Sequence, residues 1–375
     1  MVEQGQGRYN NKVDVNWLQT KADMAGSNKR LVYFERWMAP IGEEIVGAAP
    51  DIQLERLGID DDASSWAALE MAHGYQLLPS TETLQRFSPR RALIERCPQL
   101  LCISASGAGY DMIDVNACTE AGVLVVNQSG ANSESVAQHV LGMMLVLAKQ
   151  VPQSDRAIRG SARNWTRTDY TGCELTGKTI GIIGLGNIGR RVAELCTISF
   201  GMRVLAYDPY ITTDDFKTRQ AEPVDWPTVF AEADFISVNC PLTEETRGMV
   251  DAAACAMIKP GAFFISTARG GIHDEVALAA SLAEGRLAGA GLDVFEVEPP
   301  PADHPLLAFE NVIVSPHIAG VTVECRYNMA RAAAEQWLTI FAGLRPPRLV
   351  NPDAWDTYRV RFEQILGQPA LGETG

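Results

Sequence analysis

Three glycines in the segment TIGIIGLGNIGRRVAEL are spaced to hold a nucleotide phosphate. Gly184, Gly186 and Gly189 form the pattern G-x-G-x-x-G, directly after an apolar run typical of a strand and directly before a helical run. In that setting the glycines allow a tight turn, close approach of the backbone to a pyrophosphate, and close packing of helix on strand. The next apolar run ends at Asp208, about 20 residues further on. A carboxylate there can accept the ribose hydroxyls of NAD and would repel the 2′-phosphate of NADP, so the sequence predicts NAD as the cofactor.

Three side chains of complementary chemistry follow three later apolar runs. Arg269 lies near the end of AFFISTARGG, Glu298 lies just beyond AGLDVF, and His317 lies near the end of VIVSPHI. If these runs are parallel strands, their carboxyl ends meet at the sheet edge that also carries the glycine loop. Oxidation of a hydroxy acid requires a cation that binds the carboxylate, a base that removes the hydroxyl proton, and a group that sets the pKa of that base. Arginine, histidine and glutamate could supply these three groups. Two alternatives stay open at this point: Glu296 in place of Glu298, and His304 in place of His317.

The elements that must position these groups follow from an alternation of short apolar runs with helix-like stretches. Near-continuous apolar strands separated by helices predict parallel sheets covered on both faces, and the two series of runs indicate two doubly wound α/β domains. The first series is LVYFER (31–36), YQLLP (75–79), LLCISAS (100–106) and VLVVN (123–127); the second is TIGIIGLG (179–186), RVLAYDP (203–209), DFISVNCP (234–241), AFFISTARG (262–270), AGLDVF (290–295) and VIVSPHI (312–318).

Two long helices are predicted between and after these series. The stretch 132–150 is apolar around most of its circumference, which fits either a central core helix or a helix that also packs on a second subunit. A last helix over 323–341 ends before Gly343 and the pair Pro346–Pro347 and could return the chain to the first domain. Residues 1–28 are polar without a sustained period, which indicates an N-terminal extension.

Composition excludes several classes of protein. The chain has 375 residues, of which 46% are hydrophobic and 21% charged, and this is ordinary for a globular protein. A formal charge of −14 repels polyanions, so we expect neither nucleic acid nor an anionic membrane as a partner. No run is long and apolar enough for a membrane span, and the N-terminus lacks a signal-like apolar segment, which predicts a cytoplasmic protein. The eight cysteines form no CxxC pair, which favours buried thiols over a metal site.

From about residue 29 to 351 the sequence resembles the D-isomer-specific 2-hydroxyacid dehydrogenase family. The motifs that carry the resemblance are SGAGYDMID, VVNQSGANSESVAQH, GIIGLGNIG, NCPLTEETRG, STARGGIHDE, AGLDVFEVEPP and SPHIAG. The resemblance implies a Rossmann NAD-binding domain (132–320) inserted into a flavodoxin-like substrate domain (29–131 and 321–375). It also implies a homodimer formed through the helix at 132–150.

The resemblance also implies roles for individual residues. Arg269 would bind the substrate carboxylate and carbonyl, His317 would be the acid/base, and Glu298 would hold the histidine ring and favour its imidazolium form. The backbone N–H groups of Ala108 and Gly109 would meet the substrate carboxylate. Besides Gly184, Gly186, Gly189 and Asp208, the cofactor would contact Asn187, Ile188, Cys240, Pro241, Thr246, Thr267, Ala268, Asp293 and Gly320. No metal is expected.

The implied activity is hydride transfer between NAD(H) and C2 of a D-2-hydroxy acid or 2-oxo acid, and two other functions compete with it. Formate or phosphite oxidation occurs on the same architecture, but formate dehydrogenases carry Gln where Glu298 stands. A corepressor-like NAD-sensing module shares the fold, but this acidic chain gives no support for nucleic-acid contact. His273 stands where an apolar residue is more usual. The substrate side chain is expected to lie near Arg36, Trp37, Tyr75 and Tyr110.

Overall fold

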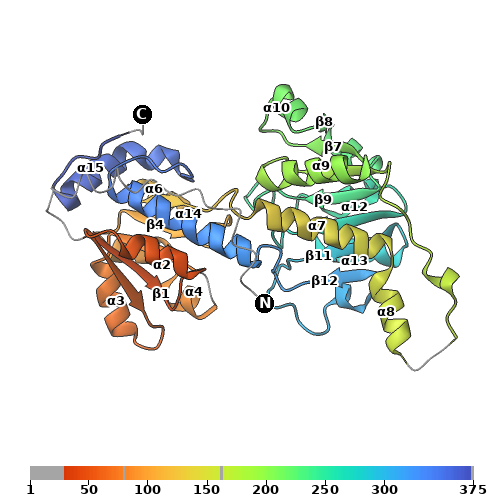
Figure 1. The fold of residues 1–375 in the computed structure, drawn as a ribbon, viewed down its shortest axis with the longest axis horizontal. Coiled ribbons are helices and arrows are strands. Elements are labelled where there is room, and N and C mark those ends of the chain that lie inside the picture. The colour runs from red at the N-terminus through yellow and green to blue at the C-terminus, as the bar shows by residue number, and fades with distance from the viewer. Residues whose placement is uncertain (1–28, 79–80, 161–163, 373–375) are drawn as a thin grey trace.

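The computed structural model describes residues 29–78, 81–160 and 164–372, which form two parallel sheets (Figure 1). The predicted extension at 1–28 lies outside the described residues. One sheet has five strands and the other has seven, and within each sheet all paired strands are parallel. The predicted α/β fold with two doubly wound sheets is therefore confirmed.

The first sheet has the strand order β2-β1-β3-β4-β5, the doubly wound order of flavodoxin-like folds. Alternate residues of β1 face two different cores. Val32 and Phe34 pack with α3 to α6, whereas Leu31 and Tyr33 pack with α2, α14 and α15. The elements are β1 (Lys29–Phe34), α2 (Pro40–Gly47), β2 (Ile52–Leu57), α3 (Asp62–Glu70), β3 (Gly74–Leu77), α4 (Thr81–Phe87), α5 (Arg91–Arg96), β4 (Cys102–Ala105), α6 (Val115–Ala121) and β5 (Leu124–Val126).

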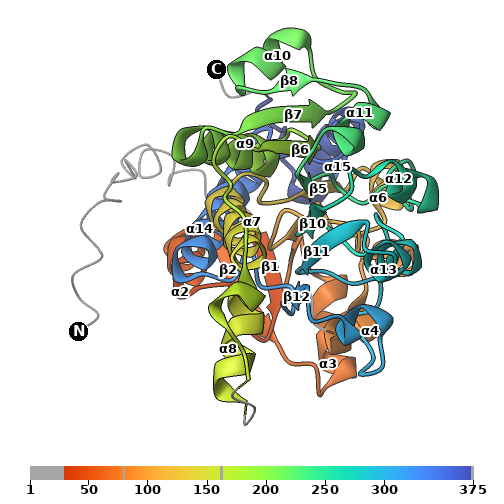
Figure 2. The ribbon, with the colours of Figure 1, turned by 90° about the vertical axis from the view of Figure 1, so that its right-hand side faces the viewer.

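The second sheet has the order β12-β11-β10-β9-β6-β7-β8, in which the strand sequence reverses between β6 and β9. Ligands of open α/β sheets bind beyond the carboxyl ends of strands at such a reversal. Helices α7 and α9 cover one face, and α11, α12 and α13 cover the other (Figure 2). The elements are β6 (Thr179–Ile183), α9 (Asn187–Phe200), β7 (Arg203–Tyr207), α10 (Thr213–Thr218), β8 (Glu222–Pro223), α11 (Trp226–Ala231), β9 (Phe235–Val238), α12 (Ala252–Met257), β10 (Ala262–Ser266), α13 (Glu275–Ala283), β11 (Leu287–Leu292), η3 (Pro305–Ala308) and β12 (Val312–Val314).

Two long helices, α7 (Ser133–Ala148) and α14 (Val323–Phe341), each lie on one of the sheets, α7 on the second and α14 on the first (Figure 1). Their first turns are joined by a hydrogen bond between the hydroxyls of Ser135 and Thr322, 2.7 Å apart. α14 packs against the first sheet, where the indole N–H of Trp337 donates to Gln76 at 2.7 Å. The predicted return of the chain to its first half is thus observed, and η4 (Pro352–Ala354) and α15 (Trp355–Leu366) continue it.

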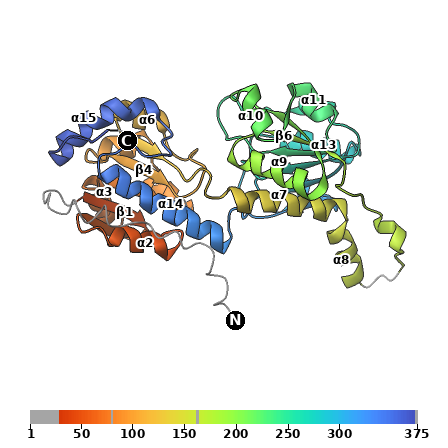
Figure 3. The same ribbon diagram turned by 45° about the horizontal axis from the view of Figure 1, so that its top comes forward.

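A helical arm follows α7 and extends away from the second sheet in all three ribbon views (Figures 1, 2 and 3). It consists of α8 (Val151–Arg159) and η2 (Arg167–Tyr170), and neither element has a buried residue. No helix within the described ranges is long and apolar enough to cross a membrane.

His273 is a buried histidine in the core of the second sheet. Its side chain is buried against Phe264, and among the described residues neither ring nitrogen has a hydrogen-bond partner. Burial lowers the pKa of His273 to about 4, although the charges of Glu275 and Asp274 oppose this shift. An unpaired buried polar group of this kind costs ~1–3 kcal/mol of stability.

We expect His273→Leu to make unfolding stability less dependent on pH. In the unfolded chain this histidine binds a proton near its ordinary pKa of 6.5, whereas the folded protein resists protonation down to about 4. Stability is therefore lost as the pH falls from 6.5 towards 4, by roughly 3 kcal/mol for this group at most. Urea unfolding of both proteins between pH 7.5 and 4 measures the difference, and equal losses of stability in wild type and variant would contradict it.

Candidate functional site

The glycine loop between β6 and α9 leaves open space for a phosphate. Gly184 has a φ of +88°, and a Cβ there would lie 2.8 Å from the backbone nitrogen of Cys240. A Cβ on Gly189 would lie 2.1 Å from the carbonyl oxygen of Gly184, so strand and helix touch through these two glycines. Gly186, by contrast, is the N-cap of α9, and a Cβ there would meet nothing within 4 Å. The backbone is therefore accessible at the helix N-terminus, where an anion is favoured.

Asp208 lies at the carboxyl end of β7, beside this loop. Its Oδ2 accepts a hydrogen bond from the N–H of Leu185 at 2.9 Å, and its Oδ1 accepts one from the N–H of Tyr210 at 3.0 Å. Each carboxylate oxygen can accept more than one hydrogen bond, so both keep capacity for a ribose hydroxyl. The carboxylate is thus held by the loop at the place where the sequence predicts the adenosine ribose.

Two buried polar atoms at the same edge have no partner within the described residues. They are Oγ1 of Thr267, just after β10, and Oδ1 of Asn239, just after β9. Buried polar groups without a partner are uncommon and call for an explanation such as a ligand. The other predicted cofactor residues follow the carboxyl ends of β6, β9, β10, β11 and β12; they are Asn187, Ile188, Cys240, Pro241, Thr246, Ala268, Asp293 and Gly320. The loop, the carboxylate and these unpartnered atoms fit a dinucleotide.

Arg269 connects this edge to the first half of the chain. Its Nε donates to Oδ1 of Asp111 at 3.0 Å, and its Nη1 donates to the carbonyl of Ala268 at 2.7 Å. Its Nη2 lies against Gly109, where a Cβ would come within 1.5 Å of that nitrogen. Any side chain at Gly109 would displace the guanidinium. Asp111 was not predicted as a partner because its place in SGAGYDMID gives no information on what it faces across the cleft.

The segment beside Arg269 presents free backbone donors. Asn127 donates to the carbonyl of Ala108 at 2.7 Å, and the N–H of Gln128 donates to the carbonyl of Gly107 at 2.8 Å. The N–H groups of Ala108 and Gly109 donate no hydrogen bond within the described residues. The loop is therefore held through its carbonyls, which leaves the two predicted substrate-binding N–H groups available.

His317 and Glu298 form the predicted pair. Nδ1 of His317 lies 2.9 Å from Oε2 of Glu298, whose Oε1 accepts a hydrogen bond from the N–H of Phe295 at 3.1 Å. Partial burial disfavours the charged form of Glu298, but the hydrogen bond and charge of His317, the Phe295 N–H and the charge of Arg269 outweigh it and lower the pKa of this carboxyl. Because Nδ1 is engaged, Nε2 is the nitrogen left for a reacting proton.

A second histidine, His304, is also paired with a glutamate, but its environment is closed. Its Nε2 lies 2.9 Å from Glu275, and its Nδ1 accepts the N–H of Leu306, so both ring nitrogens are occupied. The side chains of His304 and Glu275 are each 12% exposed, against 41% for His317. The rival carboxylate Glu296 contacts this closed pair through its backbone N–H. Accessibility therefore favours His317 with Glu298.

Asp293, which is expected to contact the cofactor, is fully buried. Its side chain has no exposed surface, and its carboxylate accepts hydrogen bonds from the hydroxyl of Ser315 and the N–H groups of Ile318 and Ala319. The observed contacts of this carboxylate are therefore with the turn that carries His317. Its predicted contact with the cofactor stays a prediction.

Two of the four residues expected near the substrate side chain are buried in the cores of the first sheet. Tyr75 is fully buried against Phe34 and Phe87 in one core of the first sheet, and Trp37 is buried in the other. Neither ring can line an open pocket, because Tyr75 is 0% and Trp37 only 4% exposed. Arg36 is exposed, and Tyr110 is partly buried.

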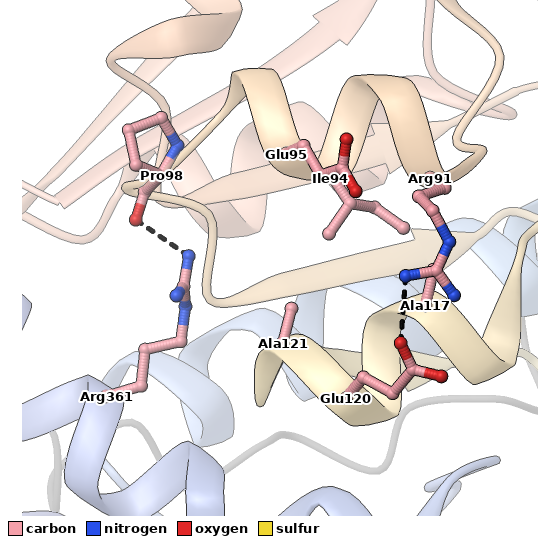
Figure 4. A pocket seen from close by; sticks show the side chains of 8 residues that line it. All are labelled: Arg91, Ile94, Glu95, Pro98, Ala117, Glu120, Ala121 and Arg361. Carbon is pink, nitrogen blue, oxygen red and sulfur yellow. Dashed lines mark hydrogen bonds and ion pairs between the residues drawn. The ribbon is translucent and has the colours of Figure 1, made fainter.

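A cavity of about 330 Å³ lies away from this edge, between α5, α6 and α15 (Figure 4). Its charged groups already have partners: Arg91 pairs with Glu120 at 2.8 Å, and Arg361 donates to the carbonyl of Pro98 at 2.7 Å. None of the predicted site residues lines it.

Comparison with known proteins places this site in a family. Residues 141–319 match the NAD binding domain of D-isomer specific 2-hydroxyacid dehydrogenases. D-3-phosphoglycerate dehydrogenase of Archaeoglobus fulgidus is 40% identical over 259 residues, which are 69% of this chain and 49% of that relative. The chain thus spans about half the length of the curated relatives it matches.

Solved structures agree with this match. D-lactate dehydrogenase from Aquifex aeolicus, complexed with NAD and lactic acid, superposes with a TM-score of 0.72 at 26% identity, covering 84% of this chain and 96% of the other. A glyoxylate reductase from Paecilomyes thermophila gives 0.76 at 27% identity, covering 86% and 98%. The second domain of the chain therefore belongs to the D-isomer-specific 2-hydroxyacid dehydrogenase family, and NAD is its cofactor.

Proposed function

We propose that the protein is an NAD-dependent dehydrogenase that interconverts a D-2-hydroxy acid and its 2-oxo acid, with Arg269, Glu298 and His317 as its reacting set. The observation that carries the proposal is the exposed His317–Glu298 pair, 2.9 Å apart, at the sheet edge that also holds Arg269 and the glycine loop. A small-molecule acid is therefore the proposed substrate.

The chain's own residues divide the work of the reaction. Arg269 offers its remaining N–H donors to the substrate carboxylate and carbonyl, next to the free N–H groups of Ala108 and Gly109. In oxidation, neutral His317 removes the hydroxyl proton through Nε2, and in reduction protonated His317 returns it. Glu298 holds Nδ1 and stabilises the imidazolium that forms. NAD, when bound, supplies the hydride acceptor or donor at C2.

Charge in the site favours an anionic substrate despite the net charge of −14. Arg269 supplies the cation, and only one carboxylate, Asp111, forms an ion pair with it within the described residues. Local potential in a cleft, rather than net charge, sets the concentration of a charged ligand there.

The activities named for the relatives suggest the order in which candidate substrates should be tested. The curated relatives at about 40% identity are D-3-phosphoglycerate dehydrogenases, so 3-phosphohydroxypyruvate is the first 2-oxo acid to test. The structural neighbours reduce glyoxylate or bind lactic acid by name, so glyoxylate and pyruvate follow. Formate oxidation is disfavoured because Glu298, not a glutamine, engages His317.

We expect NADH-dependent reduction of at least one of these 2-oxo acids, measured at 340 nm, and its loss in His317→Ala. Removing the acid/base should lower kcat by roughly 10²- to 10⁴-fold while NADH still binds, as measured by its fluorescence. His304→Gln is the matched control, because His304 is the other histidine paired with a glutamate, and it should keep most of its turnover. Intact NADH binding without turnover of any 2-oxo acid would favour a binding module instead.

Asp208 should set the choice between the two nicotinamide cofactors. Asp208→Ala removes the carboxylate that would repel a 2′-phosphate, so the ratio of kcat/KM for NADH over NADPH should fall by about tenfold or more. Asp214→Ala removes one exposed carboxylate from α10 in the same half of the chain and should leave that ratio unchanged. An unaltered ratio in Asp208→Ala would show that another group selects the cofactor.

We also propose that the chain forms a homodimer through α7 and the arm. Leu145 on α7, Val151 at the start of α8 and Trp165 before η2 are all large apolar side chains that are at least 36% exposed. Val151 and Trp165 belong to the arm, whose elements α8 and η2 have no buried residue, and Leu145 lies on the last turn of α7, just before it. Exposed apolar side chains grouped in this way are typical of a protein interface, and a second copy of the chain is the occupant that the resemblance implies.

Analytical ultracentrifugation tests the dimer directly. Wild type should sediment with about twice the chain mass at micromolar concentration, and Val151→Glu with Trp165→Glu should shift it to the monomer, because charges would be buried at the contact. Ile198→Glu, on α9 and 70% exposed, is the control and should stay dimeric. A wild-type monomer would refute the proposal.

A further inference from the structure

The backbone of His317 is in a left-handed conformation that needs support. Its φ is +54°, one of four positive values at residues other than glycine within the described ranges. Such a conformation costs a non-glycine residue ~1–2 kcal/mol, and it persists only where neighbouring contacts hold it. The contacts that hold this turn therefore also set the direction of the imidazole.

Asp293 supplies most of those contacts. Its carbonyl accepts the N–H of His317 at 2.8 Å, and its carboxylate accepts the N–H groups of Ile318 and Ala319, each at 2.8 Å. Three successive backbone donors are thus bound by one residue. The carboxylate also accepts the hydroxyl of Ser315, at 2.6 Å, from the other side of the turn.

The number of protons available fixes which group donates in the hydrogen bond between Ser315 and His139. An ionised carboxylate can only accept, so the hydroxyl of Ser315 donates its single proton to Asp293. The hydroxyl must then accept from the ring of His139, whose Nε2 lies 3.0 Å away, and this assigns the proton to Nε2. A directed chain results, from His139 to Ser315 to Asp293.

His139 also lies close to the fully buried carboxylate of Asp293. Its Nε2 lies 3.8 Å from Oδ1 of Asp293, and in the described part of the chain no lysine or arginine forms an ion pair with that group. Buried carboxylates require compensating donors or charges. α7 can approach so closely because β11 carries Gly291, where a Cβ would lie 3.0 Å from Met143 on α7.

We infer that His139 is a positioning residue for the acid/base histidine: it donates to Ser315 and, through Ser315 and Asp293, holds the turn that aims His317 into the cleft. The inference rests on the proposed dehydrogenase function for its consequence in turnover. His139 lies on α7 and is not proposed to contact the substrate.

Exchanging the hydrogen-bond donor tests this chain of contacts. His139→Leu keeps an apolar bulk but removes the donor, and kcat for the best 2-oxo acid should fall about tenfold, because small misplacements of a reacting group are costly. KM for NADH should stay unchanged. His139→Gln restores an N–H donor and should recover most of the loss. Gln138→Ala changes the adjacent exposed residue, whose amide donates to Glu134, and it should match wild type.

A double-substitution cycle separates positioning from a general structural effect. Ser315→Ala cuts the chain one step later, so adding His139→Leu to it should lower kcat little further. An equal, independent loss of kcat in the Ser315→Ala background, or no recovery in His139→Gln, would overturn the inference.

Backbone hydrogen exchange makes the test independent of activity. In the protein without cofactor, His139→Leu should speed exchange of the amides at 317–319 several-fold, and Gln138→Ala should not. Unchanged exchange would also overturn the inference. If instead the wild type lacks dehydrogenase activity while exchange responds as expected, the proposed function fails and the positioning chain stands.

Discussion

Close contact between Arg269 and Gly109 is the constraint on which the site depends. The guanidinium fits only because residue 109 has no side chain, and Asp111 fixes it from the first half of the chain. This one contact brings the loop after β4 against the end of β10, so donors from both sheets face the same space. Its energetic worth as an ion pair is small at partial exposure, but its geometric effect is large because it fixes which edge of the arginine is free.

In the second sheet, glycines likewise allow a close approach that forms the cofactor site. Glycines bring β6, α9 and the end of β9 so close together that no side chain fits between them, and the helix N-terminus is left open beside them. Beside that opening the carboxylate of Asp208 is held by backbone N–H groups, whereas Oγ1 of Thr267 and Oδ1 of Asn239 have no partner within the described residues. A site built in this way is formed before its ligand arrives, which reduces the entropy lost to ordering on binding.

Two histidine–glutamate pairs of equal length differ in what surrounds them. In one, both ring nitrogens of His304 are occupied and both side chains are enclosed, which makes the pair a structural support for the segment after Phe295. In the other, Nε2 of His317 is left free at an accessible edge. The same two residue types thus support structure or chemistry, depending on accessibility.

The sequence alone determined the features that arise from local pattern. Continuous apolar runs and glycine spacing predicted most parallel strands, the phosphate loop, Asp208 at a strand end, and a helix whose bounds, Val323–Phe341, match the structure. Edge strand β2 was missed because Gln53 and Arg56 are exposed and interrupt its apolar pattern, and β8 is too short to produce one. Only the tertiary structure could bury Tyr75 and Trp37, pair Arg269 with Asp111, and enclose Asp293 beneath His317. These depend on contacts between residues far apart in the chain, and periodicity along one segment carries no information on what another segment places against it.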